Sequence, residues 1–195
     1  MTSRSRRHPA IAEARERRAQ IDDPAIVLEA AARFLEPRAR SVLEVRRRLT
    51  GAGYRTNLVD GAIDRMLELE MLDDEAFARA WVESRDRARP RGERAIRAEL
   101  GLKGVDRATV DLVLGERREM LPGGGTAGGV QASADLVAAD RLLANHRRNL
   151  ERVADPRQRR QRAYQLLARN GFDPETSREA AARLDRDRGL EAEDD

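Results

Sequence analysis

The side chains best suited to chemistry in this chain are arginines, and Lys103 is the only lysine. Arginine stays charged and holds phosphate or carboxylate groups with two parallel hydrogen bonds. Clustered arginines therefore favour contact with a polyanionic or acidic partner, although a solvated helix face with local ion pairs would look the same in sequence. The candidate contact residues are Arg46, Arg47, Arg48, Arg94, Arg97, Lys103, Arg157, Arg159, Arg160 and Arg162.

Other residue patterns argue against catalysis. The two histidines, His8 and His146, have no plausible partner residues near them in sequence, and cysteine is absent. The pair Asp73-Asp74 is explained by a helix start, where acidic side chains are favourable. The glycines of 123–129 lack the GK[ST] ending and the preceding strand of a phosphate loop. We therefore predict no catalytic residue, no metal site and no cofactor, and we expect a protein that is not an enzyme.

Charge is spread unevenly along the chain. The formal net charge is +3, yet residues 141–162 carry eight arginines against two acids, and residues 173–195 carry nine acids against four arginines. Aromatic residues make up only 3% and apolar residues 40% of the chain, which favours thin helical layers over one thick core. No long apolar run indicates a signal peptide or a membrane span, so we expect a cytoplasmic protein with no membrane partner.

One short phrase occurs three times, and it predicts how helices end. In each copy a leucine precedes a glycine by four residues, and an apolar residue follows the glycine. A glycine just past a helix can adopt the left-handed conformation, which brings the flanking apolar side chains together. The three predicted helix ends are Leu49, Gly53 and Tyr54; Leu100, Gly104 and Val105; and Leu167, Gly171 and Phe172.

Helix starts alternate with these ends. Asp23-Pro24, Ser41 with Glu44, Asp106, Ser133, Asp155-Pro156 and Asp173-Pro174 are typical of helix N-termini. Apolar residues at helical spacing follow each start, and Ile26, Leu67 and Trp81 belong to the predicted core faces. No strand pattern competes, so the sequence predicts an all-α fold of nine helices in three triplets.

The triplets align with one another, which predicts three tandem three-helix repeats in an elongated, solenoid-like array. The predicted boundaries are a mobile Arg-rich segment with some helix at 1–21, repeats at 22–72, 73–118 and 135–188, a Gly-rich flexible linker at 119–134 and an acidic tail at 189–195. Chance similarity between helices rich in Ala and Leu is the alternative.

Three segments resemble the RecX family. They are Ser41 to Gly53, Leu72 to Ala78 and, most specifically, the run from Pro90 to Val105, and the third phrase at 166–172 is also similar. The resemblance implies a non-enzymatic bacterial regulator made of tandem three-helix repeats. Such proteins bind the filament of the RecA recombinase on DNA and restrain its growth, strand exchange and co-protease activity, and they can bind DNA weakly. The Gly-rich insertion and the Arg-rich N-terminus depart from the family pattern.

The leading hypothesis is thus a monomeric RecA regulator of DNA repair and the SOS response. Two alternatives stay open at this point. A direct DNA-binding helical regulator would bind DNA tightly without recombinase and with steep salt dependence. A helical-repeat scaffold for another complex would bind neither RecA nor DNA.

Overall fold

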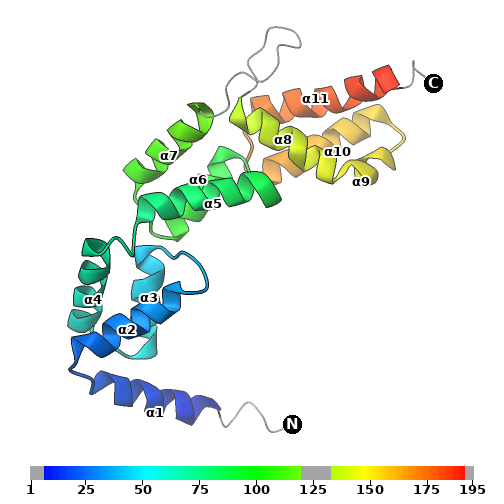
Figure 1. The fold of residues 1–195 in the computed structure, drawn as a ribbon. Helices are drawn as coiled ribbons and strands as arrows, with labels where there is room; N and C mark the ends of the chain where they lie inside the picture. The colour runs from blue at the N-terminus through cyan, green and yellow to red at the C-terminus, as the bar shows by residue number, and fades with distance from the viewer. Residues whose placement is uncertain (1–6, 120–132, 192–195) are drawn as a thin grey trace. The chain divides into compact units, whose positions relative to one another are not determined.

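The structure, a computed structural model, describes residues 7–119 and 133–191 (Figure 1). These residues form α-helices joined by short loops, with no strand in either range, so the predicted all-α fold is confirmed. The helices are α1 (Arg7–Ala19), α2 (Pro24–Leu35), α3 (Val42–Ala52), α4 (Thr56–Glu68), α5 (Asp74–Ala88), α6 (Glu93–Leu102), α7 (Arg107–Glu119), α8 (Ala134–Asn145), α9 (Arg147–Glu151), α10 (Pro156–Arg169) and α11 (Pro174–Glu191).

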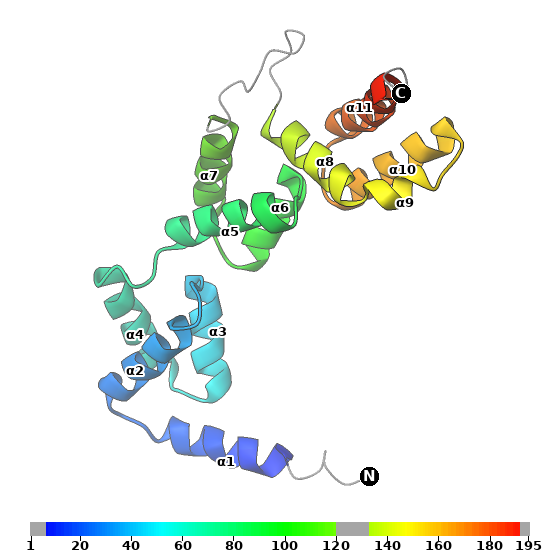
Figure 2. The same cartoon turned by 45° about the vertical axis from the view of Figure 1, so that its right-hand side comes forward.

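The chain divides into two compact units, which are described separately. The first contains the chain up to Phe77 together with the loop Lys103–Asp106, and the second contains Ala78–Leu102 with the chain from Arg107 onward. The helices of each unit can be followed in Figures 1 and 2. The predicted repeat boundaries stay a prediction.

The core of the first unit lies among α2, α3 and α4. Two helix starts form as the sequence predicts: Asp23 accepts a hydrogen bond from the backbone N–H of Ala25, and Ser41 and Glu44 form a capping box. These caps satisfy backbone N–H groups that have no partner within the helix. The buried apolar residues of this core are Val27, Ala31, Val45, Leu49, Val59, Ala62, Ile63, Met66 and Leu72.

The second unit has an apolar core among α8, α10 and α11. Ser133 and Asp155 cap α8 and α10 as predicted, since their side chains accept hydrogen bonds from Leu136 and Arg157 backbone N–H groups. The helices α6 and α7 bury a further apolar set. The buried residues of the core among α8, α10 and α11 are Leu136, Ala138, Ala139, Leu142, Leu143, Leu150, Ala163, Leu167, Phe172, Ala180 and Ala181. Those on α6 and α7 are Ile96, Leu100, Val110, Val113 and Leu114.

The three predicted glycine turns are confirmed. Gly53, Gly104 and Gly171 have φ values of 104°, 83° and 86°, all in the left-handed region. At the first turn, the Tyr54 N–H donates to the Leu49 carbonyl over 3.3 Å. The equivalent bond at the third turn, from Phe172 to Leu167, is also 3.3 Å long, as expected of this helix ending.

Some details of the sequence prediction are wrong. The described residues form eleven helices instead of nine, because α1 occupies most of the predicted mobile segment and α9 follows α8 directly. Ile26 and Leu67 were expected in the core but are 44% and 43% exposed. Helix α11 reaches Glu191 and so includes the start of the predicted acidic tail. Residues 120–132 of the predicted linker and 192–195 of the tail lie outside the described residues.

Candidate partner-binding surface

The arginines of α3 have three different environments. Arg46 forms an ion pair with Asp60 of α4. The Arg48 guanidinium lies 5.6 Å from the centre of the Phe34 ring, within range of a cation–π contact. Arg47 is exposed and has no ion-pair partner in the described chain. Of this cluster, Arg47 is therefore the residue best placed to contact another molecule.

A similar division holds on α6. Arg94 is exposed and has no acidic partner within the residues described. Arg97 bridges Asp111 and Glu93, with a 3.1 Å contact to the Glu93 carboxylate. Its hydrogen bond and charge lower the pKa of Asp111 below its usual value. Arg97 is thus held by its neighbours, whereas Arg94 is available.

Lys103, another predicted contact residue, is engaged inside the first unit. Its Nζ atom lies 2.6 Å from Oε1 of Glu44, and the two side chains are 24% and 19% exposed. Partial burial alone would raise the pKa of Glu44, but the hydrogen bonds from Lys103 and the Ser41 N–H outweigh it and lower that pKa. We therefore assign Lys103 a structural contact.

The basic cluster of α10 contains one residue for which the predicted surface role is wrong. Arg159 is 6% exposed, and its Nη1 atom donates to the Val153 carbonyl over 3.1 Å. It precedes buried Ala163 by four residues and buried Leu167 by eight, so helical spacing places it on the inner face. This spacing is a sequence signal for burial of Arg159, whereas its positive charge alone predicts a surface position.

The remaining arginines of this cluster, Arg157, Arg160 and Arg162, are exposed. A hollow of about 280 Å³ between α10 and α11 is lined by Arg157 and Arg160 together with Arg178, Tyr164, Gln161 and Ala181. Sequence reasoning missed Arg178, because its position opposite α10 depends on how the two helices pack. Three guanidinium groups around one hollow favour an anionic ligand.

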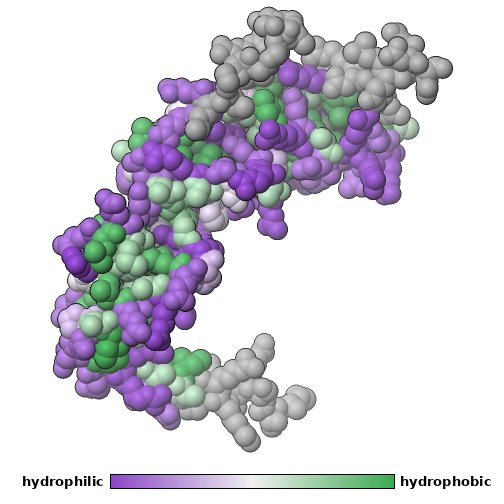
Figure 3. Space-filling view, viewed as in Figure 1, coloured by the Kyte–Doolittle hydropathy of each residue, from purple (hydrophilic) through white to green (hydrophobic). Residues whose placement is uncertain are grey.

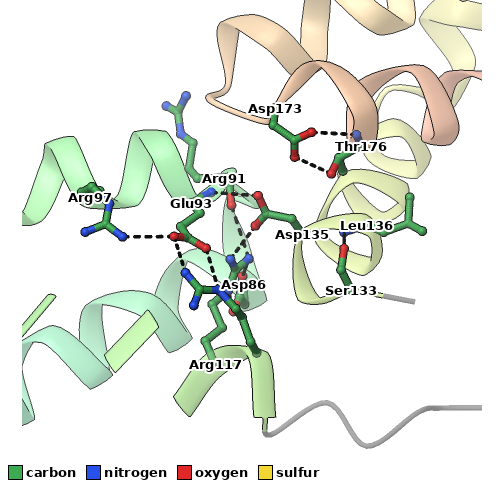
Figure 4. A network of polar contacts seen from close by, with 11 residues as sticks. Asp86, Arg91, Glu93, Arg97, Arg117, Ser133, Asp135, Leu136, Asp173 and Thr176 are labelled. Atoms are coloured by element: carbon green, nitrogen blue, oxygen red, sulfur yellow. Dashed lines mark hydrogen bonds and ion pairs between the residues drawn. The ribbon is translucent and has the colours of Figure 1, made fainter. Parts of the chain in front are cut away.

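Arg117 anchors a buried polar network in the second unit (Figure 4). Its guanidinium makes two parallel bonds to Asp86, of 2.9 and 2.8 Å, and a third of 2.6 Å to Asp135. Asp135 also accepts the Glu93 N–H over 3.0 Å. Burial raises the pKa of Asp135, and the bonds from Glu93 and Arg117 oppose that rise. This network connects α5, α6, α7 and α8.

Close backbone packing accompanies the network. The Gly92 N–H donates to the Asn170 carbonyl over 3.1 Å, and Arg91 donates to the Asn170 side chain over 2.7 Å. A Cβ atom at Gly92 would lie 2.3 Å from the Phe172 nitrogen, far inside ordinary contact distance. Glycine is therefore required where α6 begins.

The groups considered for catalysis take structural roles where the structure describes them. Asp73 accepts the N–H groups of Glu75 and Ala76 at the start of α5, and Asp74 accepts that of Val42. The Nδ1 atom of His146 lies 3.0 Å from the Leu142 carbonyl. Within the described ranges, no group of acidic, histidine or cysteine side chains could hold a metal ion, and no helix could cross a membrane.

The face drawn in Figure 3 is largely hydrophilic, with apolar patches between the hydrophilic residues. A family model described as the second three-helix domain of RecX matches residues 73–114. "Regulatory protein RecX" of Mycolicibacterium vanbaalenii is 32% identical over 147 residues, which cover 72% of each chain. The protein of the same name from Mycobacterium sp. is 34% identical over 143 residues, covering 72% of this chain and 71% of that one.

Solved structures agree with this match at the level of the fold. The crystal structure of RecX from Lactobacillus salivarius has a TM-score of 0.67 and 18% identity, covering 84% of this chain and 97% of that one. A second crystal structure of a regulatory protein RecX has a TM-score of 0.64 and 19% identity, covering 90% and 76% of the two chains. With the mycobacterial relatives matched over more than two thirds of its length, the chain belongs to the RecX family.

Proposed function

We propose that this protein binds the filament of the RecA recombinase on DNA and modulates it, mainly by inhibition of its recombinase, ATPase and co-protease activities. Membership of the RecX family is the observation that carries the proposal. In this role the protein acts in DNA repair and the SOS response, in the cytoplasm, as a monomer. It regulates without catalysis and without a cofactor.

The surface offers groups suited to a filament of protein and nucleic acid. Arg47, Arg94, Arg157 and Arg162 are exposed and have no ion-pair partner among the residues described. Such arginines can bind phosphates or carboxylates without first leaving an internal partner. Leu67, Leu69 and Met71 are 43–47% exposed at the end of α4 and add apolar area suited to a protein partner.

The test measures RecA-driven ATP hydrolysis on single-stranded DNA while this protein is titrated. We expect the rate to fall as protein is added. A variant with Arg47, Arg94, Arg157 and Arg162 replaced by alanine should need at least tenfold more protein, because each lost charged contact weakens binding. Unchanged hydrolysis at saturating wild-type protein would refute the proposed function.

A matched control replaces four other exposed arginines. Arg33, Arg65, Arg87 and Arg107 are 55–91% exposed, and each lies in an ion pair within its own helix. Because such pairs contribute little to stability, this variant should fold and inhibit like the wild type. Equal loss of inhibition in both variants would show that only total charge matters.

The hollow between α10 and α11 favours a second candidate function, direct binding of DNA. Three arginines and Tyr164 line it, and no acidic side chain of the described residues does. Fluorescence anisotropy with a labelled single-stranded oligonucleotide, without RecA, separates the two functions. Direct binding should weaken with salt by about 0.7 log units of affinity per log unit of salt for each phosphate neutralised, and Arg178→Ala should reduce that slope. A scaffold for another complex would bind neither RecA nor the oligonucleotide.

A further inference from the structure

Each glycine turn receives a hydrogen bond from another part of its own unit. The acceptor is always the carbonyl of the residue just before the glycine. A carbonyl at a helix end has no partner within the helix, so it is a natural docking point. The three bonds are Arg18 Nη1 to Ala52 O at 3.3 Å, Ser41 Oγ to Lys103 O at 2.6 Å, and Gly92 N to Asn170 O at 3.1 Å.

The same partner segments pack tightly over the glycines. A Cβ atom on Gly104 would lie 2.5 Å from Leu43 Cβ, and one on Gly171 would lie 2.4 Å from Ala95 Cβ. At Gly53 it would lie 2.7 Å from the carbonyl oxygen of Arg15. Each glycine therefore ends one helix and also provides the space in which another segment docks.

The segment that docks differs at the first turn. The Gly104 turn lies on the N-terminal end of α3, at Ser41 and Leu43, and the Gly171 turn lies on the N-terminal end of α6, at Gly92 and Ala95. The Gly53 turn instead lies on the body of α1. There the Arg18 side chain supplies the hydrogen bond that Ser41 and Gly92 supply at the other turns.

Helix α1 is held weakly. None of its residues from 10 to 19 is buried, and Ile11 is 59% exposed. Besides the packing of Arg15 on Gly53, its contacts include the Arg18 bond, a cation–π contact of Arg18 with Tyr54 at 5.9 Å, and a 3.0 Å bond from Arg55 Nε to the Ala19 carbonyl. Because an isolated helix of 13 residues is marginal in water, α1 depends on these few contacts to stay folded.

We propose that the turn Ala52–Tyr54 is an interaction surface and that α1 is its displaceable occupant. The partner that fits is the N-terminal end of an α-helix with a hydrogen-bond donor at its cap position, which is the element that the Gly104 and Gly171 turns hold. The turn Ala52–Tyr54 contains none of the contact residues Arg47, Arg94, Arg157 and Arg162. The proposed interaction at the turn does not depend on RecA binding. Release of α1 exposes the Ala52 carbonyl and the Tyr54 ring to such a partner.

Hydrogen exchange on the full-length chain tests whether α1 covers the turn. Arg18→Ala removes the bond to Ala52 and the contact with Tyr54, and alanine itself favours helix. We expect amides in 7–20 and 49–56 to exchange at least fivefold faster, since a typical hydrogen bond accounts for that factor. Arg17→Ala is the control, because Arg17 is exposed and has no side-chain partner in the described chain. Equal exchange in the two variants would overturn the proposal.

A peptide tests the chemistry of the partner. The probe is a fluorescein-labelled peptide of residues 40–50, which contains the N-terminal end of α3 with the Ser41 hydroxyl as hydrogen-bond donor. It should bind the Arg18→Ala chain at least fivefold more tightly than the wild type, because α1 competes for the turn. Ser41→Ala in the peptide should weaken that binding about fivefold. Equal affinity for the two chains, or equal affinity of the two peptides, would refute the inferred partner.

Discussion

Replacing Gly92 with alanine tests how closely α6 and the turn after α10 approach each other. The new Cβ atom would lie 2.3 Å from the Phe172 nitrogen and 2.4 Å from the Gly171 carbonyl, where ordinary contacts begin at 3.4 Å. The two segments must therefore separate by about 1 Å. Gly92 is not among the glycines with positive φ, so the effect comes from the contact alone.

The magnitude follows from what the separation disrupts. Overfilling a packed site costs roughly 1–3 kcal/mol. The shift also lengthens the two hydrogen bonds to Asn170, from Gly92 N–H and from Arg91, each of which contributes about 1 kcal/mol. We expect Gly92→Ala to lower the free energy of unfolding of the second unit by roughly 2–5 kcal/mol, which for a chain of this size lowers Tm by about 4–20 °C.

The assay uses the single tryptophan of the chain as its reporter. Trp81 lies in the second unit and donates to Glu99 over 2.9 Å, so its fluorescence during urea unfolding reports on that unit. Gly115→Ala is the matched control, because a Cβ atom there meets nothing within 4 Å and alanine favours the helix by about 1 kcal/mol. The reasoning is refuted if the two variants unfold at the same urea concentration.

Three further predictions concern stability. Arg117→Met leaves the Asp86 and Asp135 carboxylates without their buried partner, and it should lower the free energy of unfolding by about 3–5 kcal/mol, measured by Trp81 fluorescence. Arg118→Met removes an ion pair whose arginine is 56% exposed, and it should lower that free energy by under about 1 kcal/mol. Similar losses in the two variants would contradict the buried network. Glu70 lies two residues after α4 and has a φ of 57°, in the left-handed region. Glu70→Gly should therefore raise the free energy of unfolding by about 0.5–1 kcal/mol, measured by circular dichroism with urea, and a decrease would show that no strain is present. Because the pKa of Glu44 is lowered in the folded state, its contribution is present above its usual pKa of 4.5 and is lost as pH falls through the lower folded value. Urea unfolding from pH 7 to pH 3 should show that loss in the wild type and less of it in Lys103→Met; equal pH dependence would count against the pair.

Local signals in the sequence predicted the helix ends correctly because each depends on a few neighbouring residues. The capping box of Ser41 and Glu44 and the left-handed glycine at 53 involve contacts within one helix end. The positions of buried residues such as Ile96 and Leu100 follow from helical spacing for the same reason. The prediction of burial is wrong for Ile26 and Leu67, because their helices present more apolar residues than the neighbouring helices cover.

The candidate contact surface was less predictable because it depends on which helices meet. Arg46, Arg47 and Arg48 are consecutive, yet only the positions of Asp60 and Phe34 decide which of them is engaged. The requirement for Gly92 and the burial of Arg117 arise from residues far away in the chain, and no local pattern marks them. The sequence predicts only a mobile segment with some helix at 1–21, because no apolar stripe marks α1, whose contacts involve the Arg18 side chain and the Ala19 carbonyl.

The network around Arg117 has a consequence for how the polypeptide can be cut. Arg117 of α7 and the Glu93 N–H of α6 bond to Asp135 of α8, and the Asn170 carbonyl after α10 accepts the Gly92 N–H. Noncovalent contacts thus join the described segments on the two sides of residues 120–132. A polypeptide split at that stretch should reassemble from its two fragments through these contacts. The stretch therefore offers a site for split-protein reporters or for inserting a foreign domain.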